Sequence, residues 1–175
     1  MARLSHSLMA VCCVTLLWTS GGIAQDLGGG RGPRPLEGGP IDLAQLTQRA
    51  DLIVNGFVTA RKPAWVGRVV YTLYDVSVRE TLKGAPRNSV VMAVAGGAMG
   101  NVRLTVPGAP DLQIGEQVVF FSTVLQGTTF TPVGTFDGIV RVRQGAGVSG
   151  LTVAPRGQPE SLEAFLDEVR SLGGR

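Results

Sequence analysis

The stretch "VVYTLYDVSVRETL", residues 69–82, has the clearest strand pattern in the chain. Its side chains alternate between two sets, and this period of two is typical of a β-strand with one buried face. The set predicted to face the core consists of Val70, Thr72, Tyr74, Val76 and Val78. The set predicted to face mostly water consists of Tyr71, Leu73, Asp75, Ser77 and Arg79. We therefore expect a long antiparallel strand with one face in the core.

Four further segments have β-type composition, at residues 52–60, 89–95, 116–125 and 128–142. Gly56 interrupts the first of them, which predicts a strongly bent or bulged strand. The last is interrupted at Gly134 and Gly138. About five short strands with one or two helices are typical of a small, bent β-barrel. We therefore predict a mainly β fold, a small OB-like barrel that is closed or partly open, in a single domain at residues 41–175.

Two short amphipathic helices are expected at the ends of this domain. Near residue 42, Asp42 is a reasonable N-cap with Gln45 as its capping-box partner, and the helix should end near Ala50. The segment 161–172 places apolar side chains at helical spacing after Ser161, which can cap the helix. Its apolar stripe includes Phe165 and should pack on the barrel, because burying each large apolar side chain contributes roughly 1.5–3 kcal/mol.

The first 24 residues have the pattern of a secretory leader. Arg3 supplies the positive region, the run "LMAVCCVTLLW" at residues 8–18 is apolar, and small residues precede a cleavage site after Ala24. The run is shorter than the roughly 20 residues that a spanning helix needs, which disfavours a membrane anchor. Val11 before Cys12 disfavours a lipoprotein. We expect a mature chain that starts near Gln25 and is periplasmic or extracellular, with no stable membrane insertion after cleavage.

Removal of this leader would remove every thiol and imidazole, since both cysteines and His6 lie within it. A Ser-His-Asp or Cys-His catalytic arrangement and a zinc site of usual composition are therefore excluded, and no cofactor is expected. The full chain has 16 basic and 13 acidic residues, of which the leader contains only Arg3. A charge of +2 does not indicate nucleic-acid binding. The Gly- and Pro-rich residues 25–40 are predicted to be a flexible linker.

Three consecutive segments resemble an uncharacterised group of exported bacterial proteins. These are "ADLIVNGFVTA", "YTLYDVSVRETLKG" and "AGGAMG…VPGAPDLQIGEQVVFFS", which are similar to the patterns ADxIVxGxV, YTxxxxxVxxxLKG and a GG loop followed by GE in that group. The resemblance covers residues 51–122 well and the C-terminal helix loosely. The strand order is more distantly similar to the OB-type barrel of netrin and tissue-metalloproteinase-inhibitor modules. Those inhibitors chelate zinc through an N-terminal cysteine, which the mature chain would lack.

Two connections are candidate binding loops. Trp65 lies in "RKPAWVGR" between the first two strands, with Arg61 and Arg68 beside it. An exposed Trp among basic residues could stack on a sugar or contact a protein, and it could equally cap an open end of the barrel. The connection 96–115 contains Met99 and Asn101 and is longer than most loops. Its "AGGAMGN" start is mainly a turn, because no helix follows to complete a phosphate loop.

The remaining polar candidates have structural interpretations. Lys83, in an "LKG" turn, is expected to be a solvated charge. Glu116 is expected to accept hydrogen bonds from backbone donors at the start of a strand. A carboxylate acid–base pair or a calcium site remains formally possible, although no spacing singles out two carboxylates. Its candidates are Asp75, Glu80, Asp111, Glu116 and Asp137.

The preferred hypothesis is an exported, non-enzymatic protein that binds a protein or glycan of the cell envelope through Trp65, Arg61, Arg68, Met99 and Asn101. One alternative is a protease inhibitor or a companion of a secreted protease, which the distant barrel resemblance implies. The other is a carboxylate-dependent hydrolase.

Overall fold

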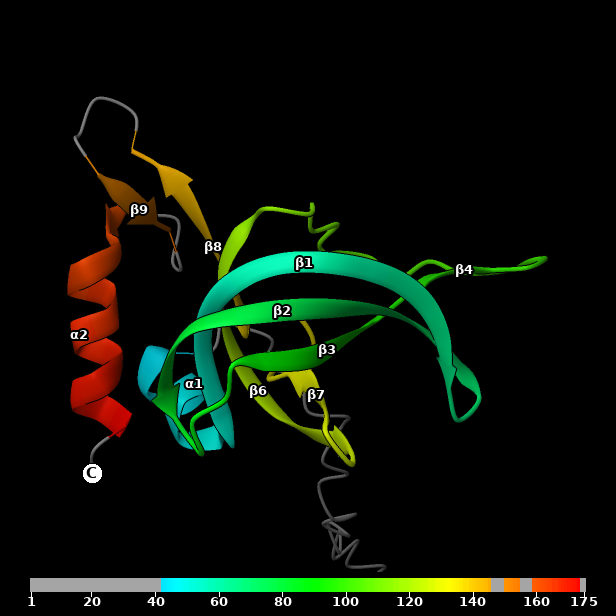
Figure 1. The fold of residues 1–175 in the computed structure, drawn as a ribbon, viewed down its shortest axis with the longest axis horizontal. Coiled ribbons are helices and arrows are strands. Elements are labelled where there is room, and N and C mark those ends of the chain that lie inside the picture. Colours follow the sequence, from blue (N-terminus) through cyan, green and yellow to red (C-terminus); the bar gives the residue numbers. More distant parts are fainter. Residues whose placement is uncertain (1–41, 146–149, 155–158, 174–175) are drawn as a thin grey trace, which may run out of the picture. The chain divides into compact units, whose positions relative to one another are not determined.

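The computed structural model describes residues 42–145, 150–154 and 159–173. The predicted leader at residues 1–24 and the predicted linker at 25–40 lie outside the described residues. The described part of the chain is mainly β, with two helices (Figure 1). In chain order the elements are α1 (Leu43–Arg49), β1 (Leu52–Val66), β2 (Val69–Lys83), β3 (Ser89–Ala95), β4 (Gly97–Met99), β5 (Val102–Leu104), β6 (Gln117–Gln126), β7 (Thr129–Pro132), β8 (Ile139–Gln144), β9 (Leu151–Val153), β10 (Glu160–Ser161) and α2 (Leu162–Gly173). Neither helix is long and apolar enough to cross a membrane.

Strand β1 has hydrogen-bonded neighbours on both sides. It pairs antiparallel with β2 from Ile53 to Val66 and with β6 from Leu52 to Phe57. The other pairings run from β2 to β3, from β3 to β7 and from β7 to β6. All of these are antiparallel except β3–β7, which is parallel. The pairings therefore form a cycle, in the order β1, β2, β3, β7, β6 and back to β1.

The curvature of β1 depends on Gly56. The β1–β2 register shifts at three points, one of them between Asn55 and Gly56, so the predicted bulge is confirmed. A Cβ atom at residue 56 would lie 2.4 Å from the Ser77 carbonyl oxygen and 2.9 Å from Cγ1 of Val76. Real Cβ atoms do not approach backbone so closely, and glycine is therefore required for the close contact between β1 and β2.

The sheet separates two hydrophobic cores. Neighbouring residues of a strand point to opposite faces, and Phe120 and Phe121 of β6 accordingly belong to different cores. The strand core contains Phe120 with Tyr74 and Met92. The helix core contains Phe121, whose ring packs edge to face on Phe165 of α2 with 6.2 Å between ring centroids. Helix α2 thus packs on one face of the sheet.

The predicted core face of residues 69–82 is also confirmed. Val70, Tyr74 and Val76 are buried, and Thr72 and Val78 are half-buried. The β region predicted at residues 128–142 is two strands instead of one, β7 and β8. Glycines at positions 134 and 138 lie in the turn that separates these strands. The short strands β4, β5, β9 and β10 were not predicted.

Two local expectations were wrong. Asp42 occupies the N-cap position of α1 but makes no side-chain capping hydrogen bond, so the predicted capping box does not form. Lys83 is not merely a solvated charge, because its ammonium group donates to the carbonyl oxygens of Thr47 at 2.7 Å and Gln48 at 3.3 Å. These carbonyls belong to the last turn of α1, where a cation is favourable. The predicted cap by Ser161 does form, because its hydroxyl accepts from the Ala164 N–H at 3.2 Å.

Replacing Gly56 with alanine tests the close contact. We expect the free energy of unfolding to fall by about 3 kcal/mol, because the new Cβ would overlap backbone that cannot move away. Gly100→Ala is the matched control, since it has a φ of +61° but no atom within 4 Å of its Cβ position, and it should cost about 1 kcal/mol. Urea denaturation measures both values. Equal losses for the two variants would contradict the contact.

Candidate binding surface

Two β-hairpins lie together at the end of the sheet away from α2 (Figure 1). One is the outer part of the β1–β2 hairpin, residues 61–72, and the other is the β4–β5 hairpin, residues 97–104. Their turns contain Gly67 and Gly100, each with a φ of +61°. We call these two segments the hairpin end.

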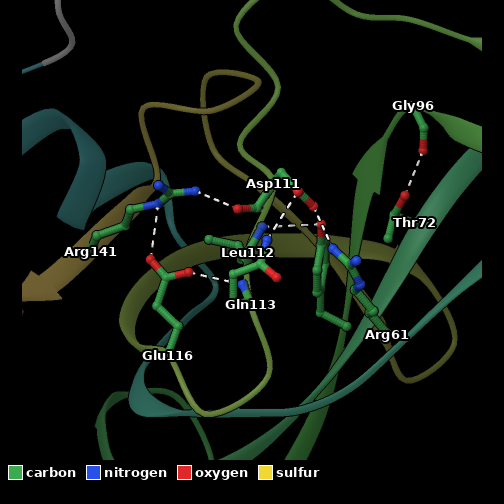
Figure 2. A network of polar contacts seen from close by, with 9 residues as sticks. Arg61, Thr72, Gly96, Asp111, Leu112, Gln113, Glu116 and Arg141 are labelled. Carbon is green, nitrogen blue, oxygen red and sulfur yellow. Dashed lines mark hydrogen bonds and ion pairs between the residues drawn. The ribbon is translucent and has the colours of Figure 1, made fainter.

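Contacts at the base hold the β4–β5 hairpin against β2. The Thr72 hydroxyl donates to the Gly96 carbonyl oxygen at 2.9 Å, as Figure 2 shows, and the Gly96 N–H donates to the Val70 carbonyl oxygen at 3.0 Å. A Cβ atom at Gly97 would lie 2.9 Å from Oγ1 of Thr72. The two glycines therefore allow the close approach that brings the hairpins side by side.

The hairpin end collects exposed apolar side chains. Among the described residues, seven large hydrophobic side chains are exposed, and four of these lie here: Trp65, Val69, Met99 and Val102. Trp65 has the largest side chain of the four and is 48% exposed. The two hairpins touch near their bases and their tips lie apart (Figure 1), so these four side chains offer exposed apolar area on two neighbouring arms, and exposed apolar area is a feature of sites that contact another molecule.

The hairpin end is also positively charged. The described residues include eleven Lys or Arg and eleven Asp or Glu. Four of the cations and none of the anions belong to the hairpin end: Arg61, Lys62, Arg68 and Arg103. The hairpin end therefore has an excess of positive charge, whereas the cations and anions of the described residues as a whole are equal in number.

The structure brings the residues singled out in the sequence to this surface. Trp65 and Arg68 lie near the tip of the β1–β2 hairpin, and Met99 and Asn101 lie at the tip of the β4–β5 hairpin. Trp65 belongs to neither hydrophobic core. Arg61 differs from the others, because its guanidinium group forms an ion pair with Asp111 at 2.6 Å and its charge is compensated (Figure 2).

The second half of the connection 96–115 is anchored to the sheet, although some of its side chains, such as Ile114 at 63%, are exposed. The segment after the β4–β5 hairpin is held against the sheet, with Leu112 fully buried and the Arg141 guanidinium donating to the Asp111 carbonyl oxygen at 2.7 Å. Glu116 accepts from the Gln113 N–H at 2.9 Å, as predicted, and pairs with Arg141 at 3.1 Å (Figure 2). Residues 97–104 are thus the part of the connection that forms a separate hairpin, while Asp111, Leu112 and Glu116 belong to the scaffold.

Three contributors to the surface were missed in the sequence: Val69, Val102 and Arg103. The signal was present, since Gly100-Asn101 separates two short apolar segments as a two-residue hairpin turn would. Three-residue strands are too short to show an alternating pattern, so the segment was interpreted as a turn within a long connection.

Three of the five carboxylates considered for catalysis have ion-pair partners. Glu80 pairs with Arg170, Asp111 with Arg61, and Glu116 with Arg141. Within the part of the chain that the structure describes, no group of three or more His, Cys, Asp or Glu side chains could hold a metal ion. These contacts assign Asp111 and Glu116 to the scaffold beside the hairpin end and Glu80 to the contact between β2 and α2.

Tyr74 connects this scaffold to the strand core and has a testable ionisation. Burial raises the pKa of its phenol above the ordinary value of 10.0, while the hydrogen bond that its oxygen accepts from the Leu112 N–H opposes the shift. In a Tyr71→Phe variant, which keeps Tyr74 as the only tyrosine, we expect the absorbance of the phenolate to appear with a midpoint above pH 10.0.

The folded protein keeps this proton where the unfolded chain releases it, so the free energy of unfolding should fall as the pH rises above 10.0. Tyr74→Phe should remove that dependence. A phenolate midpoint at or below pH 10.0 would contradict the burial of this phenol.

Two comparisons with known proteins gave no match. No protein-family model matches the chain, and no curated protein matches it either. Any proposal for its function depends on the exposed side chains and the charge of the hairpin end.

Proposed function

We propose that this chain is an exported, non-enzymatic binding protein whose hairpin end binds a protein with an acidic surface. The observation that carries this proposal is the coincidence, on one pair of hairpins, of four exposed apolar side chains with three cations that form no ion pair with a described carboxylate: Lys62, Arg68 and Arg103. Apolar contact area supplies affinity, and complementary charge supplies association rate and specificity.

The scaffold of this proposal is an OB-like barrel. Its support is the pairing order, in which β1 pairs with both β2 and β6 and the parallel pair β3–β7 completes the cycle. OB-type barrels bind their ligands with loops and strand faces at one side of the barrel. The resemblance of residues 51–122 to exported bacterial proteins agrees with the leader-like residues 1–24, and together they support a location in the periplasm or outside the cell.

Trp65 is the residue that we expect to contribute most. Aromatic side chains with a wide exposed surface are enriched among the residues that dominate protein interfaces. The side chain is held on a long two-stranded arm, where Trp65 pairs with Val70. A side chain on a preformed strand loses less conformational entropy on binding than one on a flexible loop.

The charges of the hairpin end determine how binding should respond to salt. Lys62, Arg68 and Arg103 form no ion pair with a described carboxylate. Exposed charges such as these accelerate encounter with an oppositely charged surface, and salt screens the effect. Binding should therefore be faster at low ionic strength.

The test starts with photo-crosslinking from position 68 in the cell that exports the chain, which identifies the partner. For the purified pair, we expect Trp65→Ala to weaken binding by about 30-fold, as truncation of a central interface Trp costs roughly 2 kcal/mol or more. Val124→Ala is the matched control, because Val124 is 54% exposed but lies on β6. It should leave the affinity unchanged.

Neither variant should shift the thermal midpoint appreciably, because both side chains are exposed. Undiminished binding by Trp65→Ala would contradict the proposed surface. A large fall in the thermal midpoint of Trp65→Ala would instead show that Trp65 stabilises the fold. Capture of an acidic glycan in place of a protein would keep the surface and correct the class of partner.

A further inference from the structure

A second candidate site lies away from the hairpin end. A cleft of about 450 Å³ opens between α2 and the strands β1, β2 and β6. This volume lies within the range of small-molecule sites, which is roughly 300–1,000 Å³. Side chains of Asn55, Gln117, Arg79, Leu162, Glu163 and Leu166 line it.

Two buried amides line the sheet side of the cleft. Asn55 is 3% exposed and Gln117 is 8% exposed, and the Gln117 amide nitrogen donates to the Asn55 carbonyl oxygen at 2.9 Å. Their neighbours on the same face, Ile53 and Val119, are apolar members of the helix core. Burying an amide side chain costs desolvation free energy that burying an apolar side chain does not. A ligand that pairs with the amides would account for polar residues at these two positions.

The amide pair has the chemistry to recognise a peptide group. The bond between the two side chains does not use the Asn55 amide nitrogen or the Gln117 carbonyl oxygen. One of these atoms is a donor and the other an acceptor. A peptide bond carries the complementary acceptor and donor, and buried polar groups of this kind select strongly for a ligand that pairs with them.

The charges around the cleft point to a ligand with both signs of charge. Glu80 and Arg170 compensate each other, because Arg170 donates to one oxygen of Glu80 through Nη2 at 2.7 Å and Nε at 3.1 Å. Arg79 and Glu163 form no ion pair with another described residue. The lining therefore offers one cation for a carboxylate and one anion for an ammonium group.

We propose that this cleft binds a short zwitterionic peptide such as a free dipeptide. Arg79 receives the terminal carboxylate, Glu163 receives the terminal ammonium group, and the Asn55–Gln117 pair bonds to the peptide group between them. Leu162 and Leu166 of α2 contact an aliphatic side chain of the ligand. The inference is independent of the hairpin end, which is formed by other residues of β1 and β2 and by β4 and β5.

Calorimetric titration with alanyl-leucine tests the proposal, with the N-acetylated, C-amidated dipeptide as the uncharged probe. We expect the free dipeptide to bind and the capped one to bind at least about 10-fold more weakly, because it lacks both charged termini. Arg79→Gln should weaken binding of the free dipeptide by a similar factor. Arg143→Gln is the matched control, since Arg143 is exposed and does not line the cleft.

A double variant, Asn55→Leu with Gln117→Met, separates recognition from structure. It preserves the shape of the two side chains and removes the amides, so binding should be lost while the thermal midpoint stays equal or rises. Trp65→Ala should leave dipeptide binding unchanged. No binding by the unsubstituted protein at about 10 mM dipeptide, equal binding of the capped probe, or undiminished binding by the double variant would each overturn the proposal.

Discussion

The close contact at Gly56 is the constraint on which the rest of the structure depends. β1 pairs with β2 on one side and β6 on the other, and it can approach the backbone of Ser77 this closely only because residue 56 has no side chain. Strand β1 therefore belongs to two regions of the molecule. Its first half lies between the two cores, and its second half extends beyond β6 toward the hairpin end.

This division explains how a stable scaffold can present an exposed surface. Residues 52–56 of β1 are buried between β2 and β6, where their apolar side chains contribute to both cores. Beyond them, the same strand pairs only with β2 and carries Trp65 at its end. The ion pair between Arg61 and Asp111 links this arm to the segment before β6, and Leu112 buries that segment against Tyr74. The proposed binding at the tip and the stability of the base thus depend on different residues.

Much of the strand content could be predicted from the sequence, because patterns within a single strand are local. The alternation in residues 69–82 and the glycine within residues 52–60 each predict a feature that the structure contains. Contacts between distant residues could not be predicted in this way. Arg61 and Asp111 are 50 residues apart, and Asn55 and Gln117 are 62 residues apart. Trp65 was identified as a candidate from the basic residues beside it in the sequence. Val102 and Arg103 could not be identified, because the strands of their hairpin are too short to show an alternating pattern.

Amide hydrogen exchange resolved by residue tests the shared role of β1 most directly. Between Ile53 and Phe57 the strand has partners on both sides, so the account predicts that consecutive amides there are all strongly protected. Between residues 61 and 66 it pairs with β2 alone, and the five amides there (Pro63 has none) should alternate between slow and fast exchange according to whether they face β2. Rapid exchange throughout residues 53–57, or uniform protection along the whole strand, would contradict the account.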